Sequence, residues 1–150
     1  MPSYFFDTSA LVKRYYDEQG TEMVDTIIEP AENDVLITSL AVIETVSAFR
    51  RKQNRDSISR EEVDSLLAAF FDEALADFQI VPLGEQLFDY AFELILEDDL
   101  RTLDSLQLSA ARALATNVED LTFVCADKKL IDVAQSKELP AINPTTDDAQ

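Results

Sequence analysis

Short apolar runs alternate along the chain with longer stretches in which apolar residues recur at helical spacing. The short runs predict strands at about residues 4–6, 35–38, 79–81 and 122–125, with a further short segment at 141–142. The longer stretches predict helices at about residues 9–16, 21–28, 39–52, 60–76, 85–96, 103–115 and 128–136. Strands that alternate with helices are typical of a parallel sheet covered on both faces. We therefore expect a single α/β domain over residues 1–150, with a polar, frayed tail from about residue 145.

Polar residues mark the boundary between two of these helices. Residues 54–59 are polar and are expected to connect them. Ser59 and Glu62 then have the spacing of a capping box, in which each side chain bonds the backbone of the other. Thr38 or Ser39 can cap the helix that begins near residue 39.

Length and composition fit one domain with a real core, since the chain has 150 residues and 47% hydrophobic content. No apolar run approaches the roughly 18–20 residues that span a membrane, and the first residues lack the features of a signal peptide. The one cysteine, Cys125, cannot form an internal disulfide and is expected to be a small buried residue. We expect a cytoplasmic protein that does not enter a membrane.

Two residue types are scarce enough to exclude whole classes of chemistry. The chain has no histidine, which removes the usual general base near neutral pH and the usual zinc ligand. A Ser-His-acid triad and a Cys-His pair are therefore excluded. Only 2 glycines occur, so the glycine-rich phosphate loops are absent as well. Any catalysis must use carboxylates, hydroxyls, amines and bound ions.

The formal net charge is −18, from 30 acids against 12 bases, and such a surface repels nucleic acids. It also fits adaptation to high salt. Bound divalent ions would invert the local field, and the bases crowd one stretch: Arg50, Arg51, Lys52, Arg55 and Arg60. Two interpretations of that stretch stay open. It is either a solvated helix end, where cations suit the helix dipole, or a contact for a substrate or partner, with Arg50 and Arg51 as substrate-binding candidates.

Four acids stand at unusual positions in this pattern: Asp7, Glu44, Asp104 and Asp127. Asp7 and Asp127 follow predicted strands, where open α/β sheets bind ligands. Glu44 lies in a largely apolar helical stretch, where an unpaired buried carboxylate is costly. If the four converge, they form an oxygen-rich site for Mg²⁺ or Mn²⁺ and indicate metal-assisted phosphoryl chemistry.

Each acid also has a structural alternative. Asp7 and Asp127 can cap the helices that follow them. Asp104 can form a capping box with Gln107. Glu44 can form a salt bridge or face solvent. The hydroxyls of Thr8 and Ser9 either cap a helix or bind a phosphate oxygen.

Several segments resemble the PIN domain and, within it, the VapC-type toxins of toxin–antitoxin pairs. They are residues 4–13 (YFFDTSALVK), 39–44 (SLAVIE), 100–111 (LRTLDSLQLSAA) and 124–130 (VCADKKL), together with Asn143-Pro144. The resemblance implies an α/β/α sandwich with strand order 3-2-1-4-5. It implies a Mg²⁺- or Mn²⁺-dependent ribonuclease whose acids are Asp7, Glu44, Asp104 and Asp127. It departs at Gln107, where many relatives have histidine.

The resemblance also implies a homodimer that is inhibited by a small antitoxin protein inserting a segment at the active-site cleft. If the chain is such a ribonuclease, Asp7 and Asp104 are the expected metal ligands. A metal-activated water would then cleave the RNA phosphodiester bond. Glu44 and Asp127 would bind outer-sphere or orient the water, and Thr8 or Ser9 would position the scissile phosphate.

Two rival functions are kept. A Mg²⁺-dependent phosphatase of the haloacid-dehalogenase kind requires a second aspartate two residues after the first, and Ser9 occupies that position. A catalytically silent PIN-like protein would only bind a partner, although all four acids are present.

Overall fold

The computed structural model describes residues 2–56 and 58–147 and contains one five-stranded sheet. Its strands are β1 (Ser3–Phe6), β2 (Asp34–Thr38), β3 (Gln79–Val81), β4 (Leu121–Val124) and β5 (Ala141–Ile142). All neighbouring strands pair in parallel, in the order β3-β2-β1-β4-β5. The predicted strand order and the parallel sheet are therefore confirmed.

The central strand β1 sends apolar side chains to both faces of the sheet, as its position between β2 and β4 requires. Phe5 lies opposite Phe123 of β4, and the two rings are 5.9 Å apart on one face. The next pair, Phe6 and Val124, belongs to the core of the other face. All four side chains are fully buried.

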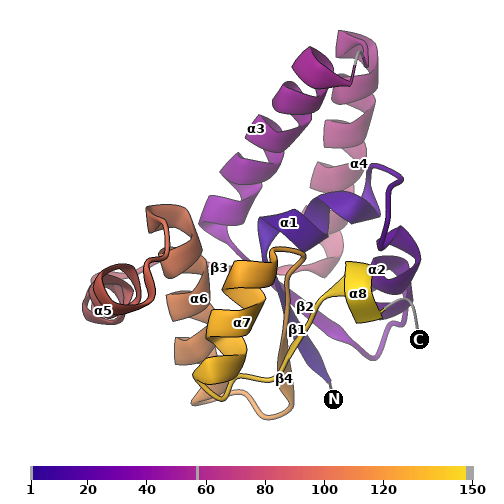
Figure 1. Ribbon diagram of the computed structural model, residues 1–150. Coiled ribbons are helices and arrows are strands. Elements are labelled where there is room, and N and C mark those ends of the chain that lie inside the picture. Colours follow the sequence, from indigo (N-terminus) through magenta and orange to yellow (C-terminus); the bar gives the residue numbers. More distant parts are fainter. Residues whose placement is uncertain (1, 57, 148–150) are drawn as a thin grey trace.

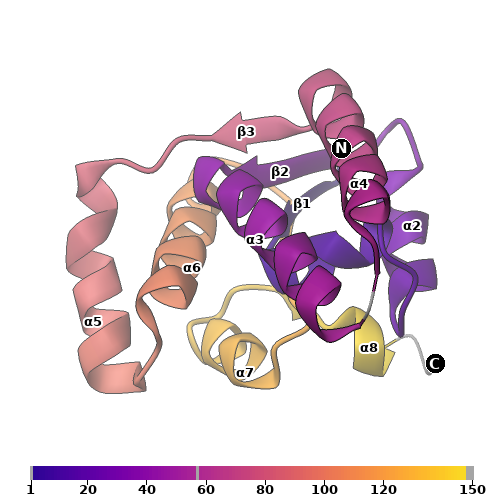
Figure 2. The same cartoon turned by 90° about the horizontal axis from the view of Figure 1, so that it is seen from above.

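Helices cover both faces and complete the three layers (Figures 1 and 2). On the Phe5 face lie α5 (Phe88–Asp98), α6 (Thr102–Ala115) and α7 (Lys128–Ser136), with the 3-10 turn η2 (Glu85–Leu87) leading into α5. On the Phe6 face lie α1 (Thr8–Leu11), α2 (Thr21–Ile28) and parts of α3 (Ser39–Arg55) and α4 (Arg60–Asp77). The α/β/α sandwich is confirmed.

Helices α3 and α4 form a hairpin that rises beyond the sheet (Figure 1). Val12, Phe49 and Val63 join this hairpin to the turn after α1 in a separate apolar cluster. The predicted capping box at Ser59 is confirmed, because Ser59 and Glu62 bond each other's backbone. The predicted connection 54–59 is wrong in its first two residues, since α3 continues to Arg55, and residue 57 lies outside the described residues. Basic side chains favour a helix carboxyl end, which explains the extension.

Other boundaries also differ from the sequence prediction. The helix predicted over 9–16 is the short α1 followed by a tighter 3-10 turn, η1 (Val12–Arg14). Helix α6 begins at Thr102 with Arg101 as its N-cap, so Asp104 lies within the first turn. The predicted capping box of Asp104 with Gln107 is therefore wrong.

The carboxyl-terminal segment begins in a short helix, α8 (Pro144–Asp147). The predicted frayed tail starts inside this helix, and its last residues, 148–150, lie outside the described residues. No helix in the described part of the chain is long and apolar enough to cross a membrane.

Candidate functional site

The carboxyl ends of the parallel strands meet at one edge of the sheet, and a pocket of about 280 Å³ opens there. Asp7 follows β1 and lines this pocket. Its backbone N–H donates to the carbonyl of Val124 on β4 at 2.9 Å. The pocket is lined by Asp7, Thr8, Ser9, Val12, Glu44, Ala48, Arg51, Lys52, Arg55, Asp104 and Asp127.

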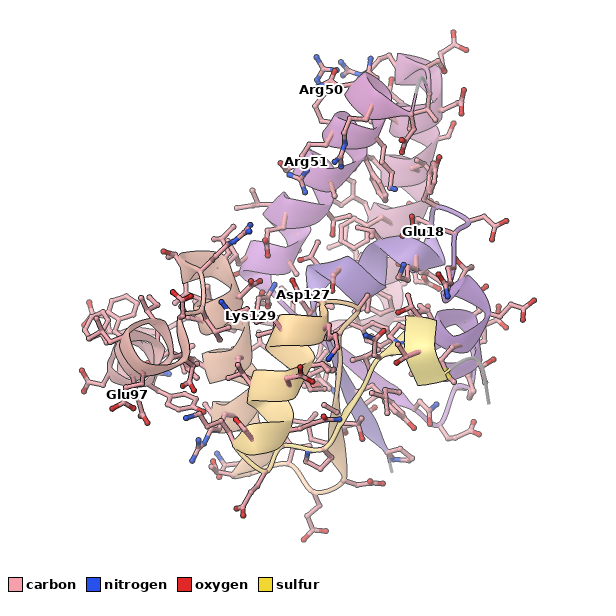
Figure 3. All side chains as sticks on the ribbon, in the orientation of Figure 1. Glu18, Arg50, Arg51, Glu97, Asp127 and Lys129 are labelled. Atoms are coloured by element: carbon pink, nitrogen blue, oxygen red, sulfur yellow. The ribbon has the colours of Figure 1, made fainter. Side chains whose placement is uncertain are left out.

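The pocket brings together most of the residues that the sequence singles out. All four acids, both hydroxyl residues and Arg51 line it. Arg50 does not, and its guanidinium instead donates to Oδ1 of Asn54 on its own helix at 3.0 Å. Figure 3 shows Arg50 and Arg51 on α3 and Asp127 at the start of α7. Convergence at one pocket is therefore a feature of the fold, whereas the chemical roles of these residues stay predictions.

Asp7 is a buried carboxylate, with only 4% of its surface exposed. Its Oδ2 accepts hydrogen bonds from the hydroxyl of Ser9 at 2.6 Å and from the Ser9 backbone at 3.1 Å, so the predicted helix cap does form. Burial raises the pKa of Asp7 to about 6, although the hydrogen bonds from Ser9 lower it. The negative charges of Asp104 and Glu44 also raise the pKa. The site thus holds an acid whose charge is unfavourable in the metal-free protein.

Cys125 is a neighbour of Asp7 and is fully buried, as predicted. Its Sγ is 3.8 Å from Oδ2 of Asp7 and accepts the backbone N–H of Asp127 at 3.3 Å. Burial raises the pKa of the Cys125 thiol, and the charge of Asp7 adds to the effect. The cysteine is therefore a protonated packing residue rather than a nucleophile.

Glu44 is half-buried and is held by two neutral donors rather than by a cation. Its Oε1 accepts the hydroxyl of Thr8 at 3.1 Å and the side-chain amide of Gln107 at 2.9 Å. Among the residues that the structure describes, Glu44 forms no salt bridge, so that alternative is not realised. These bonds explain how a carboxylate is tolerated beside apolar helix positions.

Asp127 and Asp104 complete the acid cluster from the other side of the pocket. Asp127 caps α7, with Oδ1 accepting the backbone N–H of Leu130 at 3.1 Å. Asp104 is half-buried, and burial raises its pKa, with Asp127 and Glu44 adding to the rise. The cations Arg101 and Lys129 partly oppose this rise. Mutual repulsion of these acids is the strain that a bound cation would relieve.

The donor chemistry of the pocket fits a divalent ion that prefers oxygen ligands, such as Mg²⁺ or Mn²⁺. In residues 2–56 and 58–147, however, no three acidic or cysteine side chains stand close enough together to hold an ion as they are. One oxygen each of Asp7, Glu44 and Asp127 is held by a hydrogen bond from the protein. Because Mg²⁺ is commonly held by one or two carboxylates and completed by water, the second oxygen of each of these acids can contact an ion or its water.

Sequence reasoning overlooked the role of Gln107 and the influence of Arg101 and Lys129. Gln107 lies at helical spacing with Ala110 and Ala111 on the buried face of α6. An amide on an apolar helix face is a signal, because a buried polar group requires partners. No comparable signal distinguishes Arg101 or Lys129, which are exposed.

Several solved structures have a similar fold. VapBC2 from Rickettsia felis, bound to a DNA fragment from its promoter, matches with a TM-score of 0.64 and 19% identity, over 94% of this chain and 98% of that one. FitAcB from Neisseria gonorrhoeae matches with a TM-score of 0.64 and 18% identity, over 94% and 97%. The toxin–antitoxin protein VapBC-5 from Mycobacterium tuberculosis matches with a TM-score of 0.58 and 15% identity, over 95% and 99%.

None of the curated proteins matches the sequence. The family model for the PIN domain matches residues 4–136, a range that contains β2, β3, β4, all of β1 except Ser3, and all four acids of the pocket. The chain belongs to the PIN domain family.

Proposed function

We propose that this chain is a divalent-metal-dependent endoribonuclease that acts as the toxin of a type II toxin–antitoxin pair. The observation that carries the proposal is the convergence of four carboxylates, two hydroxyls and three cations on one pocket at the carboxyl edge of a PIN-domain sheet. The similar folds include the toxin–antitoxin protein VapBC-5. These features support a nuclease better than either rival function.

Asp7 and Asp104 are the proposed direct ligands of Mg²⁺ or Mn²⁺. Both carboxylates have a raised pKa in the metal-free protein, so both would gain from a cation. A bound divalent ion would acidify the attacking water and stabilise the charge that develops on the phosphate. Glu44 and Asp127, each anchored by one oxygen, are proposed to orient that water with the other oxygen.

The hydroxyls of Thr8 and Ser9 donate hydrogen bonds to two of the carboxylates. Their hydroxyl protons point to Oε1 of Glu44 and Oδ2 of Asp7. We propose that one hydroxyl turns to a scissile phosphate oxygen once the carboxylate charge is satisfied by a cation. The predicted contact to a phosphate oxygen is therefore kept, with the added condition that a cation is bound.

Arginines on α3 are the proposed contacts to the RNA backbone. Seven of the 12 lysines and arginines form ion pairs with carboxylates, but Arg50, Arg51 and Arg55 form none with any described residue. Arg51 and Arg55 line the pocket. Unpaired cations beside the acids give an otherwise acidic surface one place to meet a polyanion. We propose Arg51 as a direct substrate contact and Arg50 as a more distant one.

A homodimer, a small inhibitory antitoxin and a cytoplasmic location complete the proposal. Several helices expose large apolar side chains that a partner could cover, among them α3 with Ile43. Helix α5 presents Phe88, Phe92 and Leu96 on one face, and the exposed fraction of Leu96 is 84%. Helix α4 presents Phe71 and Leu75. We assign the α5 stripe to the homodimer and leave the pocket and its rim to the antitoxin.

The test is cleavage of single-stranded RNA by the purified protein with Mg²⁺ or Mn²⁺. We expect cleavage that EDTA stops and that Asp104→Asn abolishes without unfolding the protein. Equal cleavage by wild type and Asp104→Asn would indicate a contaminating nuclease. A folded protein that cleaves no RNA in a varied panel would favour the silent binding module, and release of phosphate from a small phosphomonoester would favour the phosphatase.

A further inference from the structure

Gln107 is a buried amide that contacts two residues of the pocket without lining the pocket itself. It lies on α6, one turn after Asp104, and only 1% of its surface is exposed. Its Nε2 donates to Oε1 of Glu44 at 2.9 Å and to Oγ1 of Thr8 at 3.3 Å. A side chain this deeply buried is retained only where its polar atoms find partners, and here the partners belong to the candidate site.

The orientation of the Gln107 amide is set from the opposite side by Thr38. The Thr38 hydroxyl accepts the backbone N–H of Ala41 at 3.0 Å and donates its single proton to Oε1 of Gln107 at 2.9 Å. Because Oε1 is engaged there, the N–H donors of the amide face Glu44. The reverse orientation would bring two acceptor oxygens together at the carboxylate. The amino-terminal cap of α3 thus determines which end of the amide reaches the acid.

Both donors to Glu44 meet the same oxygen. Thr8 and Gln107 bond Oε1, and Oε2 accepts no hydrogen bond within the part of the chain that the structure describes. The arrangement therefore fixes the carboxylate by one oxygen and leaves the other for the pocket. An amide does this without adding a positive charge, so the negative potential that attracts a cation is undiminished.

We propose that Gln107 is a positioning residue that holds the Glu44 carboxylate toward the water of a bound divalent ion, and that it thereby supports binding of the ion. The proposal rests on the proposed function, since it assumes that the pocket binds Mg²⁺ or Mn²⁺. Groups that orient metal-binding side chains typically contribute 10–100-fold in metal affinity. A core residue that only fills space would influence folding but not the Glu44-dependent part of that affinity.

The experiment is a double-mutant cycle read by Mn²⁺ affinity in titration calorimetry, with metal-free thermal unfolding as the check on folding. The four proteins are wild type, Gln107→Met, Glu44→Ala and the double variant. Methionine keeps the length and flexibility of the side chain but removes the donor. We expect Gln107→Met to weaken Mn²⁺ binding by about 10-fold in the wild-type background. In the Glu44→Ala background the same change should have almost no effect.

Ser109→Ala is the matched control, because Ser109 is a buried polar residue of α6 whose hydroxyl donates to the Ser105 carbonyl on its own helix. It should leave Mn²⁺ affinity unchanged. If Gln107→Met does not fold, Thr38→Val and Thr38→Ser replace it. The valine variant loses the hydroxyl that orients the amide and should bind Mn²⁺ more weakly, whereas the serine variant keeps it and should not.

Two results would overturn the positioning role while leaving the metal site intact. One is equal Mn²⁺ affinity in wild type and folded Gln107→Met. The other is an equal loss of affinity in both backgrounds, which would mean a general packing effect. A wild-type protein that binds no Mn²⁺ would instead overturn the proposed function, and the role of Gln107 with it.

Discussion

The hydroxyl of Ser9 donates a 2.6 Å hydrogen bond to Oδ2 of Asp7 and accepts the backbone N–H of Ala126 at 3.0 Å. The hydroxyl proton is thereby directed to a buried carboxylate, and the hydroxyl oxygen accepts a backbone N–H of the segment that follows β4. Ser9 thus links the acid after β1 to the segment that leads to Asp127.

Ser9→Ala should weaken both the fold and the acid site. The change removes a short bond to a buried acid and leaves the Ala126 N–H without its partner, at a cost of about 1–3 kcal/mol in the free energy of unfolding. It should also raise the pKa of Asp7 further, because the Ser9 bonds lower it. Urea unfolding and an NMR titration of the carboxyl carbon measure the two effects. Ser9→Thr, which keeps the hydroxyl, is the control, and wild-type values for Ser9→Ala would contradict the account.

Asp7→Asn should stabilise the metal-free protein, and more at high pH than at low pH. The pKa of Asp7 is raised from its ordinary 3.8 to about 6. The favourable contribution of protonated Asp7 is therefore complete below the unfolded pKa and is lost as the pH rises through about 6. Above that pH the ionised group destabilises the fold by something on the order of 3 kcal/mol, since one pKa unit corresponds to 1.36 kcal/mol.

The measurement is the free energy of unfolding of wild type and Asp7→Asn in EDTA between pH 4 and pH 8. The difference between the two proteins should grow across pH 4–6 in favour of the variant. Asp17→Asn is the matched control, because Asp17 is exposed and does not line the pocket. A constant difference for Asp7→Asn would mean that burial does not perturb this acid.

The sheet could be predicted from sequence because its strands are short apolar runs, and apolar side chains on both faces of β1 leave few alternatives to a central buried strand. The strand order came from the resemblance to PIN domains. Helix ends were harder to predict from sequence, because α3 continues to Arg55 through polar residues that carry no stop signal. The turn η1 is set by packing of Val12 against Phe49 and Val63, which are distant in sequence.

The acids of the pocket could be identified because each stands at the end or start of a predicted element or within an apolar stretch. Asp7 and Asp127 follow predicted strands, Asp104 stands at a predicted helix start, and Glu44 lies in an apolar helical stretch. Their hydrogen-bond partners could not, because those contacts join distant segments. Gln107 reaches Glu44 across 63 positions and Thr38 across 69. The spacing of Asp104 and Gln107 suggested a capping box instead, which the N-cap at Arg101 excludes. Arg50 and Arg51 are adjacent in sequence, yet only the helical rotation places Arg51 at the pocket.

Arg51→Gln should weaken RNA binding more than Arg50→Gln does. Arg51 lines the pocket, whereas Arg50 lies off it and bonds Asn54. Loss of one phosphate contact should reduce the slope of log affinity against log salt by about 0.7 for single strands. Fluorescence anisotropy with an Asp104→Asn protein, which should not cut the probe, measures this slope. Arg112→Gln is the control, since Arg112 bonds Tyr90 away from the pocket. Identical slopes for all variants would remove α3 from the proposed RNA path.

Charges placed on the α5 stripe should convert the proposed homodimer to a monomer. Phe92 and Leu96 are one helical turn apart and largely exposed, so burying a carboxylate at either position in an interface would be costly. Wild type should have twice the 16.8 kDa mass of one chain in light scattering, and Phe92→Asp with Leu96→Asp should have the single mass. Leu75→Asp on α4 should remain a dimer. A monomeric wild type would disprove the dimer, and a dimeric double variant would place its interface elsewhere.

Anomalous diffraction from crystals soaked in Mn²⁺ tests whether Asp7 and Asp104 build a divalent-ion site. We expect an anomalous peak in the pocket, about 2.0–2.6 Å from carboxylate oxygens of both residues. The peak should be missing or much weaker in Asp7→Asn crystals treated in the same way. A wild-type pocket without a peak at saturating Mn²⁺, or a peak that Asp7→Asn leaves unchanged, would mean that these two acids do not hold a divalent ion.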